Sequence, residues 1–302
     1  MHERRRRPRR PRAAAAALAT AALVVGALAG CAAAAPSDDA VGSAAGAGAD
    51  TAATVPGDAG TASGATLWPA GAGFDYQLGG ASPVPDGVTV VARDSTDEPA
   101  GSGFDICYVN GFQTQPGAVW PDELLVHRSS GELLVDPGWP DEHLFDVSTP
   151  ANREALAELQ EPVIEGCATA GFDAVEFDNL DSYSRSEGAL DLDDAVAFAT
   201  LLVQRTHDAG LAAGQKNTAE LEARGRDEIG FDFAVTEECD RWDECSTFTD
   251  VYGDHVLDVE YSDDLRGSFD DVCARADTPA STILRDRDLV PADDDAYEYE
   301  RC

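Results

Sequence analysis

Eight short apolar segments between residues 74 and 287 constrain the fold of this chain most strongly. Each segment ends in polar residues, and the later ones are separated by stretches with apolar residues at helical spacing. Strands that alternate with helices predict a parallel sheet, and eight such strands favour an α/β fold closed as a single (β/α)₈ TIM barrel. The expected strands are Phe74–Leu78, Val88–Arg93, Asp105–Asn110, Asp173–Asp178, Leu211–Lys216, Phe231–Glu237, His255–Tyr261 and Ser281–Arg287.

Helices are expected mainly in the second half of the chain. Thr149–Ala170 follows a Ser-Thr-Pro start, and Leu190–Ala209 contains Asp191 as an N-cap near its beginning. Shorter helices are expected at Ala219–Arg224 and Asp263–Ala276. The first three strands leave no room for full helices between them, so we expect an irregular early half of the barrel.

Residues 1–30 have the pattern of a bacterial signal peptide. A cluster of arginines precedes a short apolar run that ends Leu28-Ala29-Gly30-Cys31, which is typical of a lipoprotein signal with lipidation at Cys31. An ordinary cleaved signal, with Cys31 incidental, is the alternative, and the twin arginines leave the export route open. The chain is therefore expected outside the cytoplasm, either secreted or attached to the membrane by lipid alone.

Residues 31–65 are almost entirely small or polar, so they cannot bury enough apolar surface to fold and are predicted to form a flexible tether. The barrel domain is then expected over residues 66–302. No segment after the signal is apolar for long enough to span a bilayer.

The chain is strongly acidic, with a formal net charge of −36. Residues 1–30 hold seven of its 21 basic residues and one of its 57 acidic residues, so the chain without them has a formal charge of −42. Nucleic acid is a poor partner for such a protein, because its binding depends on neutralising phosphates with Lys and Arg. A cationic ligand would be attracted, although composition alone favours an acidic surface that serves only solubility or salt tolerance.

Six cysteines follow Cys31, and an even number in an exported protein predicts disulfides. Close spacing favours Cys239–Cys245, and a Cys273–Cys302 bond would fasten the end of the chain, which leaves Cys107 with Cys167. There is no Cys-x-x-Cys spacing, and the five histidines are scattered, so we expect no metal site. Walker and dinucleotide-binding motifs are also absent, and no cofactor is expected.

The stretch Gly171–Tyr183, GFDAVEFDNLDSY, combines a buried strand with a polar end. Alternate residues of a strand share a face, so Glu176 and Asp178 point to the same side as Ala174. Two acids on one face are unfavourable unless that face opens onto a polar cavity or the acids find partners. Active-site residues of TIM barrels gather at the carboxyl ends of the strands, which favours a functional role for Asp178. For Glu176, a functional role and a pairing with a neighbouring basic group are equally consistent with the sequence.

A pair of carboxyl groups at strand ends is the arrangement that glycoside hydrolysis needs, one to protonate the leaving oxygen and one to attack or stabilise the anomeric carbon. Asp178 is one candidate, and strand alternation alone does not choose between Glu237 and Glu238 for the other. Lys216 is expected either to pair with a carboxylate or to contact a substrate hydroxyl. Candidate substrate contacts, several of which could instead be packing residues, are Trp68, Tyr108, Trp139, Glu176, Asn179, Asp181, Tyr183, Lys216, Asn217, Glu260 and Tyr261.

Several segments together resemble the endo-α-1,4-polygalactosaminidase family of glycoside hydrolases. They are Trp68 followed by FDYQLGG, then ICYVNG, GFDAVEFDNLDSY, GQKN, FDFAVTEEC with a second cysteine at position 245, and VEYS. The resemblance covers residues 68–302 and implies a (β/α)₈ barrel that cleaves α-1,4-linked galactosamine polymers. It places the two catalytic acids at Asp178 and Glu237. The usual Pro before the Asp is replaced here by Phe177.

The resemblance implies a polysaccharide partner, cationic when deacetylated, and we expect a monomer. Asp178, beside Asn179 and Lys216, is expected to be the ionised carboxylate. Glu237 is expected to be the proton donor, kept partly protonated by Phe233 and Val235. A carbohydrate-binding surface lipoprotein that retains the barrel without catalysis is the alternative from another functional class.

Overall fold

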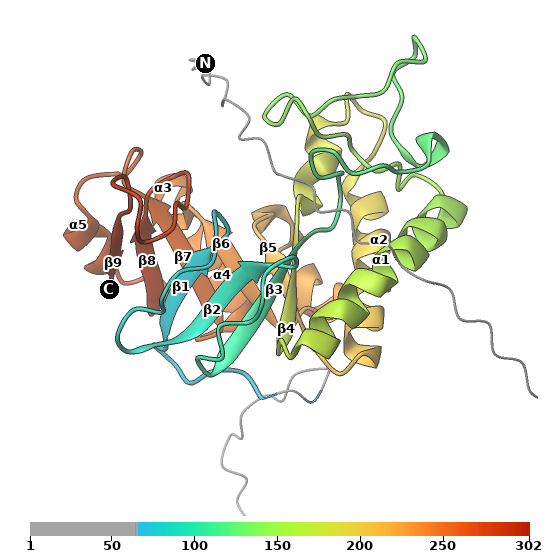
Figure 1. Cartoon of the computed structure of the whole chain (residues 1–302). Coiled ribbons are helices and arrows are strands. Elements are labelled where there is room, and N and C mark those ends of the chain that lie inside the picture. The colour runs from blue at the N-terminus through green and yellow to red at the C-terminus, as the bar shows by residue number, and fades with distance from the viewer. Residues whose placement is uncertain (1–63, 65) are drawn as a thin grey trace, which may run out of the picture. The chain divides into compact units, whose positions relative to one another are not determined.

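The fold is built on a nine-stranded sheet in which each strand pairs with the next one in sequence. The computed structural model describes residue 64 and residues 66–302, which Figure 1 shows in colour. The first eight strands run parallel and form the expected TIM barrel, and the ninth is antiparallel to the eighth. The strands are β1 (Gly73–Gln77), β2 (Val88–Asp94), β3 (Phe104–Asn110), β4 (Ala174–Asp178), β5 (Ala212–Lys216), β6 (Phe233–Glu237), β7 (Val256–Tyr261), β8 (Ser281–Arg285) and β9 (Tyr299–Arg301).

Two long helices confirm the expected pattern in the second half of the chain. In α1 (Pro150–Ala170), the Thr149 side chain accepts the N–H of Asn152 and so caps the helix, which Gly171 ends with a φ of 96°. In α2 (Leu192–Asp208), Asp191 forms a capping box with Asp194. The two helices contact each other and cover the outside of β4 and β5 (Figure 1).

The two other expected helices are shorter than predicted. The one expected at Ala219–Arg224 is only the short turn η3 (Ala219–Leu221). Gly267, with a φ of 116°, and the capping residue Ser268 delay the start of α5, which spans only Phe269–Cys273 instead of Asp263–Ala276. No helix was expected after β6, where Asp243 in the left-handed conformation separates two short ones. The elements are η1 (Asp122–Leu124), η2 (Leu180–Arg185), η3 (Ala219–Leu221), the π-helical turn η4 (Gly225–Ile229), α3 (Cys239–Trp242) and α4 (Cys245–Tyr252).

The early half of the barrel is irregular, as expected. No helix lies between β1, β2 and β3 in the described chain, and residues 111–149 form a largely irregular segment with isolated bridges such as Gln113 with Leu144 and Leu125 with Phe145. This long segment follows β3 directly, so its first residues lie at the carboxyl end of the barrel.

Each strand separates two apolar cores because its side chains alternate between the faces of the sheet. The inner core includes Phe74, Ile106 and Phe233, while Val175 and Phe177 of β4 belong to the outer core beneath the helices. Ala174 lies in the inner core. The parity predicted for β4 is therefore confirmed, and it directs Glu176 and Asp178 into the barrel.

All three expected disulfides are present. Their Cα–Cα distances are 6.0 Å for Cys107–Cys167, 4.8 Å for Cys239–Cys245 and 5.3 Å for Cys273–Cys302. The third bond fastens β9 and the chain end to α5.

Arg285 bridges β8 and β1, two strands that are joined by side-chain contacts instead of the backbone hydrogen bonds of paired strands. Its Nη1 lies 3.1 Å from Asp75 Oδ1, and it also donates to the Tyr76 carbonyl. Tyr299 of β9 donates to the Phe74 carbonyl at 2.7 Å. Both members of the Arg285–Asp75 ion pair are almost completely buried.

The expected signal peptide, Cys31 and nearly all of the expected tether lie outside the described residues. In the described part of the chain, no helix has the length and apolar character needed to cross a membrane.

We predict that Arg285→Met lowers the free energy of unfolding by about 3–5 kcal/mol, because it leaves the buried Asp75 carboxyl without its cation. Urea unfolding monitored by circular dichroism measures the change. The double variant Asp75→Asn with Arg285→Met is the control and should recover part of the loss. A single-variant loss below about 1 kcal/mol would contradict the importance of this pair.

Candidate active site

The site is formed by the last residues of three neighbouring strands: Asp178 ends β4, Lys216 ends β5 and Glu237 ends β6. In each case the next residue has a positive φ, 62° at Asn179, 46° at Asn217 and 62° at Glu238. This left-handed conformation is uncommon for residues other than glycine and turns the chain sharply at the strand end. The three candidate side chains therefore remain on strands.

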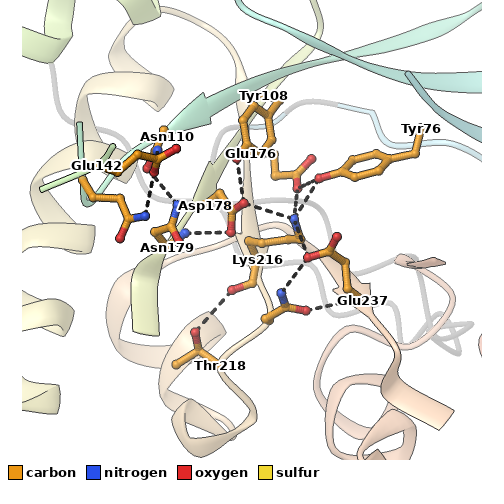
Figure 2. A network of polar contacts seen from close by, with 12 residues as sticks. Tyr76, Tyr108, Asn110, Glu142, Glu176, Asp178, Asn179, Lys216, Thr218 and Glu237 are labelled. Atoms are coloured by element: carbon orange, nitrogen blue, oxygen red, sulfur yellow. Dashed lines mark hydrogen bonds and ion pairs between the residues drawn. The ribbon is translucent and has the colours of Figure 1, made fainter. Parts of the chain in front are cut away.

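Lys216 brings three carboxylates together. Its Nζ lies 3.3 Å from Glu176 Oε1, 3.4 Å from Asp178 Oδ2 and 3.3 Å from Glu237 Oε2 (Figure 2). The expected pairing of Lys216 with a carboxylate is thus confirmed. Burial alone would lower the pKa of Lys216, but the charges of Asp178, Glu237 and Glu176 raise it well above its usual value, so the ammonium is charged.

The members of this cluster differ in their exposure. The side chains of Asp178 and Glu237 are 20% and 28% exposed, while those of Lys216 and Glu176 are 1% and 0% exposed. A ligand in the barrel mouth can therefore contact Asp178 and Glu237, and it cannot reach Glu176.

The carboxylate of Asp178 is held in its ionised form. Tyr108 donates its hydroxyl to Oδ2 at 2.7 Å, and the backbone N–H of Asn179 donates to Oδ1 at 2.7 Å. Burial by itself would raise the pKa of Asp178, but the Lys216 charge and these hydrogen bonds lower it below its usual value. An ionised, partly exposed carboxylate can act as a nucleophile.

The carboxylate of Glu237 lies among polar groups. Tyr261 donates its hydroxyl to Oε1, and Asn217 Nδ2 donates to Oε2 at 3.3 Å. Asn217 also accepts the backbone N–H of Glu237 at 2.8 Å, which fixes the end of β6. Phe233 and Val235, the apolar neighbours expected for this side chain, lie in the inner core on the same face of β6. They therefore direct Glu237 into the barrel, while the groups that contact its carboxylate are polar.

Glu176 is enclosed in the interior of the barrel. Its Oε1 accepts the Tyr76 hydroxyl at 2.7 Å, and Lys216 Nζ donates to that same hydroxyl at 2.8 Å. Among the described residues, its Oε2 has no hydrogen-bond partner. Burial raises the pKa of Glu176 to about 7, even though the Lys216 charge and the Tyr76 hydrogen bond oppose this rise.

A second network supports the loop after β4. Asn179 Nδ2 donates to Asn110 Oδ1 at 2.9 Å, and Asn110 Nδ2 donates to Glu142 Oε2 at 3.1 Å (Figure 2). Arg185 donates to Asn179 Oδ1 at 3.1 Å and pairs with Asp136 and Asp181. These contacts attach the irregular segment that follows β3 to the strand end that carries Asp178.

Sequence reasoning missed several of these residues. Tyr76 shares the inward face of β1 with Phe74, so strand alternation could have identified it, whereas Gln77, the last residue of β1, points outward. Glu142 and Arg185 lie in segments without a repeating pattern, and nothing in the local sequence distinguishes them.

The structure corrects three of the expected substrate contacts. Trp68 packs between Phe104 and Phe233, the first residues of β3 and β6, and so lies at the opposite end of the barrel from the carboxylates. Glu260 is fully buried on the outer face of β7, because Leu257, Val259 and Tyr261 occupy the inner face. Glu176 is buried beneath Lys216, as described above.

The other expected contacts stay predictions. Tyr108, Asn179, Asn217 and Tyr261 surround the two exposed acids, as described above. Trp139 is 39% exposed on the irregular segment. Asp181 is bound to Arg185 and remains 43% exposed, and Tyr183 packs partly against the outer core.

One group of side chains in the described chain has the spacing of a metal site, namely Cys239, Cys245 and Asp258. The two sulfur atoms form a disulfide, so they are not thiolate ligands. These residues therefore do not fit a metal ion in the oxidised protein.

Solved structures and a family model are similar to this chain. The chain is similar to Ega3 of Aspergillus fumigatus, solved in complex with galactosamine, with a TM-score of 0.62, 20% identity, and coverage of 79% of this chain and 98% of that chain. It also matches the glycoside hydrolase domain of PelA from Pseudomonas aeruginosa, with a TM-score of 0.46, 13% identity, and coverage of 72% and 94%. No curated protein matches the sequence. The model of glycoside-hydrolase family GH114 matches residues 57–302, so this chain belongs to that family and is a glycoside hydrolase.

Proposed function

We propose that this enzyme hydrolyses polymers of α-1,4-linked galactosamine by double displacement, with Asp178 as the nucleophile and Glu237 as the general acid and base. The observation that carries the proposal is the pair of partly exposed carboxylates on neighbouring strand ends, both in contact with Lys216. Glycoside hydrolysis needs two carboxyl groups on either side of the scissile bond.

In the first step, Asp178 attacks the anomeric carbon while Glu237 gives its proton to the leaving glycosidic oxygen. A covalent glycosyl ester forms on Asp178, and the glycosidic bond breaks. In the second step, Glu237 takes a proton from water, the water oxygen attacks the anomeric carbon, and the ester bond to Asp178 breaks. Both acids then return to their starting protonation states.

The spacing of the two acids supports this mechanism over direct attack by water. Asp178 Oδ2 and Glu237 Oε2 lie 3.4 Å and 3.3 Å from the same Nζ, so their separation cannot exceed the sum of these distances. Carboxyl groups in inverting enzymes are about 6.5–9.5 Å apart, and those in retaining enzymes are about 5–5.5 Å apart. The upper limit that Lys216 sets for these two oxygen atoms includes the whole retaining range.

The charge of the chain supports a cationic substrate. A formal net charge of −36 would attract a polymer with free amino groups and would repel an acidic one. The structural relative Ega3 was solved with galactosamine, an amino sugar of this kind. Tyr108, Tyr261, Trp139, Tyr183, Asp181, Asn179 and Asn217 are the proposed contacts for the sugar units. We assign the activity to a monomer.

The N-terminal sequence supports a location outside the cytoplasm. We assign residues 1–30 to a signal peptide, Cys31 to a lipid-modified residue and residues 31–65 to a tether that carries the barrel of residues 66–302. A lipid at Cys31 would hold the enzyme at the membrane and leave the barrel free to reach a polymer.

We predict that Glu237→Gln lowers kcat by about 10²–10⁴-fold, the usual contribution of a general acid, and that Asp178→Asn lowers it at least as much. A reducing-sugar assay on partly deacetylated galactosamine polymer measures both. The matched control is Glu238→Gln, the same change one residue away in a side chain that binds Arg287. Normal turnover in Asp178→Asn, or equal losses in Glu237→Gln and Glu238→Gln, would reject the assignment.

We predict that Lys216→Met moves the acid limb of the pH profile of kcat/KM to higher pH by about 1–3 pH units, because the pKa of Asp178 rises when the opposite charge is removed. Activity should therefore fall most at low pH. The control for net charge is Arg287→Met, which removes a cation bound to Glu238 and Asp263. An unmoved acid limb in Lys216→Met would contradict the electrostatic role of the lysine.

We predict that Cys31→Ser shifts the protein from the membrane fraction to the soluble extracytoplasmic fraction. Because Cys31 lies outside the barrel, kcat on the galactosamine polymer should stay unchanged. Cell fractionation with immunodetection measures the distribution. Continued membrane association of the variant would disprove lipid attachment at this residue.

A further inference from the structure

Glu176 is a buried acid at the centre of the site, and the proposed reaction does not use it directly. It lies on the same face of β4 as Asp178, two residues closer to the barrel interior, and its side chain is 0% exposed. Its only described contacts are the Tyr76 hydroxyl and the Lys216 ammonium. A substrate cannot touch it, so any effect on the reaction must pass through these neighbours.

The charges around Glu176 do not balance. Lys216 is the only lysine in the sequence and the only cation in contact with the three carboxylates in the described chain. If all three acids were ionised, the buried cluster would carry two uncompensated negative charges, which is strongly unfavourable in a low dielectric. The cluster must therefore retain a proton over part of the neutral pH range.

The remaining groups that face the cluster do not supply the missing charge. Burial raises the pKa of the Tyr76, Tyr108 and Tyr261 hydroxyls well above the usual tyrosine value, so all three are neutral. Asp94 at the end of β2 bonds to Thr96, and Arg285 at the end of β8 bonds to Asp75. Arg287 lies over the Tyr261 ring, but its charge is compensated by Glu238 and Asp263. Asp178 is held ionised and burial raises the pKa of Glu176, so Glu176 is the buried acid of the cluster whose charge can change near neutral pH.

We propose that Glu176 is a positioning residue that acts through Lys216 and Glu237. When Glu176 is ionised, its negative charge holds the ammonium in place and keeps the proton on Glu237, and it thereby sets the alkaline limit of activity. This inference rests on the proposed role of Glu237 as the general acid. It agrees with the rise of the Glu176 pKa to about 7, which places its ionisation in the working range.

The first test reads the charge of Glu176 without using activity. Lysine labelled with ¹³C at Cε gives a single protein signal, because Lys216 is the only lysine. In the wild-type protein this signal should shift as Glu176 ionises, with a midpoint within about one pH unit of neutrality. Because Glu237 Oε2 also lies 3.3 Å from this ammonium and would give a step of its own, the step of Glu176 is read in the Glu237→Gln background, where adding Glu176→Gln should abolish it. If the same step persists in this double variant, Glu176 does not titrate beside Lys216, and the proposal fails.

The second test reads the consequence for the reaction. In Glu176→Gln, Glu237 should lose its proton at lower pH, so the alkaline limb of kcat/KM should move down by about 1–2 pH units, the size expected for removing one nearby charge. At a pH on the alkaline limb of the wild-type profile, kcat/KM of the variant should then be about tenfold lower than that of the wild type for each pH unit that the limb moves. An unmoved limb, or an equal loss at every pH, would show a merely structural role and overturn the proposal.

Asp258→Asn is the matched control for both tests. Asp258 is also fully buried, and burial raises its pKa to about 7, but it faces outward from β7 and bonds to Thr236 and Thr282. The amide can keep these contacts, and neither the labelled lysine signal nor the alkaline limb of kcat/KM should change.

If Glu176→Gln does not fold, Tyr76→Phe replaces it in both tests. Loss of the Tyr76 hydrogen bond makes Glu176 bind a proton more strongly, so the alkaline limb should again move down.

The proposal for Glu176 and the proposal for the catalytic pair can be rejected independently. If Glu237→Gln is inactive while Glu176→Gln keeps the wild-type alkaline limb of kcat/KM, the catalytic pair stands and only the role of Glu176 is rejected. If Glu237→Gln is active, the reaction assignment itself is wrong.

Discussion

One buried ammonium group holds this active site together. Lys216 Nζ contacts the carboxylates of Glu176, Asp178 and Glu237, and it is the only lysine in a chain whose other basic residues are all arginine. A lysine ammonium is a compact charge with three donors, while an arginine guanidinium is planar and suits a single carboxylate in bidentate contact. From its place on β5, this compact group contacts three acids of strands β4 and β6.

The backbone at the strand ends makes this contact possible. Asn179, Asn217 and Glu238 each adopt a left-handed conformation directly after a functional residue. Such conformations are unfavourable by about 1–3 kcal/mol when they are strained, and surrounding contacts must hold them. At two of the three positions the contacts return to the active site: the N–H of Asn179 donates to Asp178, and Asn217 both donates to and accepts from Glu237. The turns therefore hold the acids in position as well as ending the strands.

The eight parallel strands and the inward position of Asp178 could be predicted from the sequence, because alternation on β4 and polar residues at strand ends are local patterns. Alternation did not choose between Glu237 and Glu238, and that choice came from the family resemblance. Prediction failed where the position of a side chain depends on the closed barrel. Trp68 precedes β1, and only the three-dimensional packing with Phe104 and Phe233 places it at the far end. Glu260 ends an alternating segment, but its parity is set by the inner positions of Val259 and Tyr261. Glu142 lies in an irregular segment, where no periodic signal exists to be read.

The central position of Lys216 also suits the movement of charge in the proposed double displacement. Before the reaction the negative charge lies on Asp178 and the proton on Glu237. When the glycosyl ester forms, Asp178 becomes neutral and Glu237, having given up its proton, becomes the charged partner. Because Nζ lies 3.4 Å from one carboxylate and 3.3 Å from the other, the ammonium can compensate either charge without moving. A fixed charge that serves both states needs no reorganisation during the reaction, which is the condition under which electrostatic stabilisation lowers a barrier most.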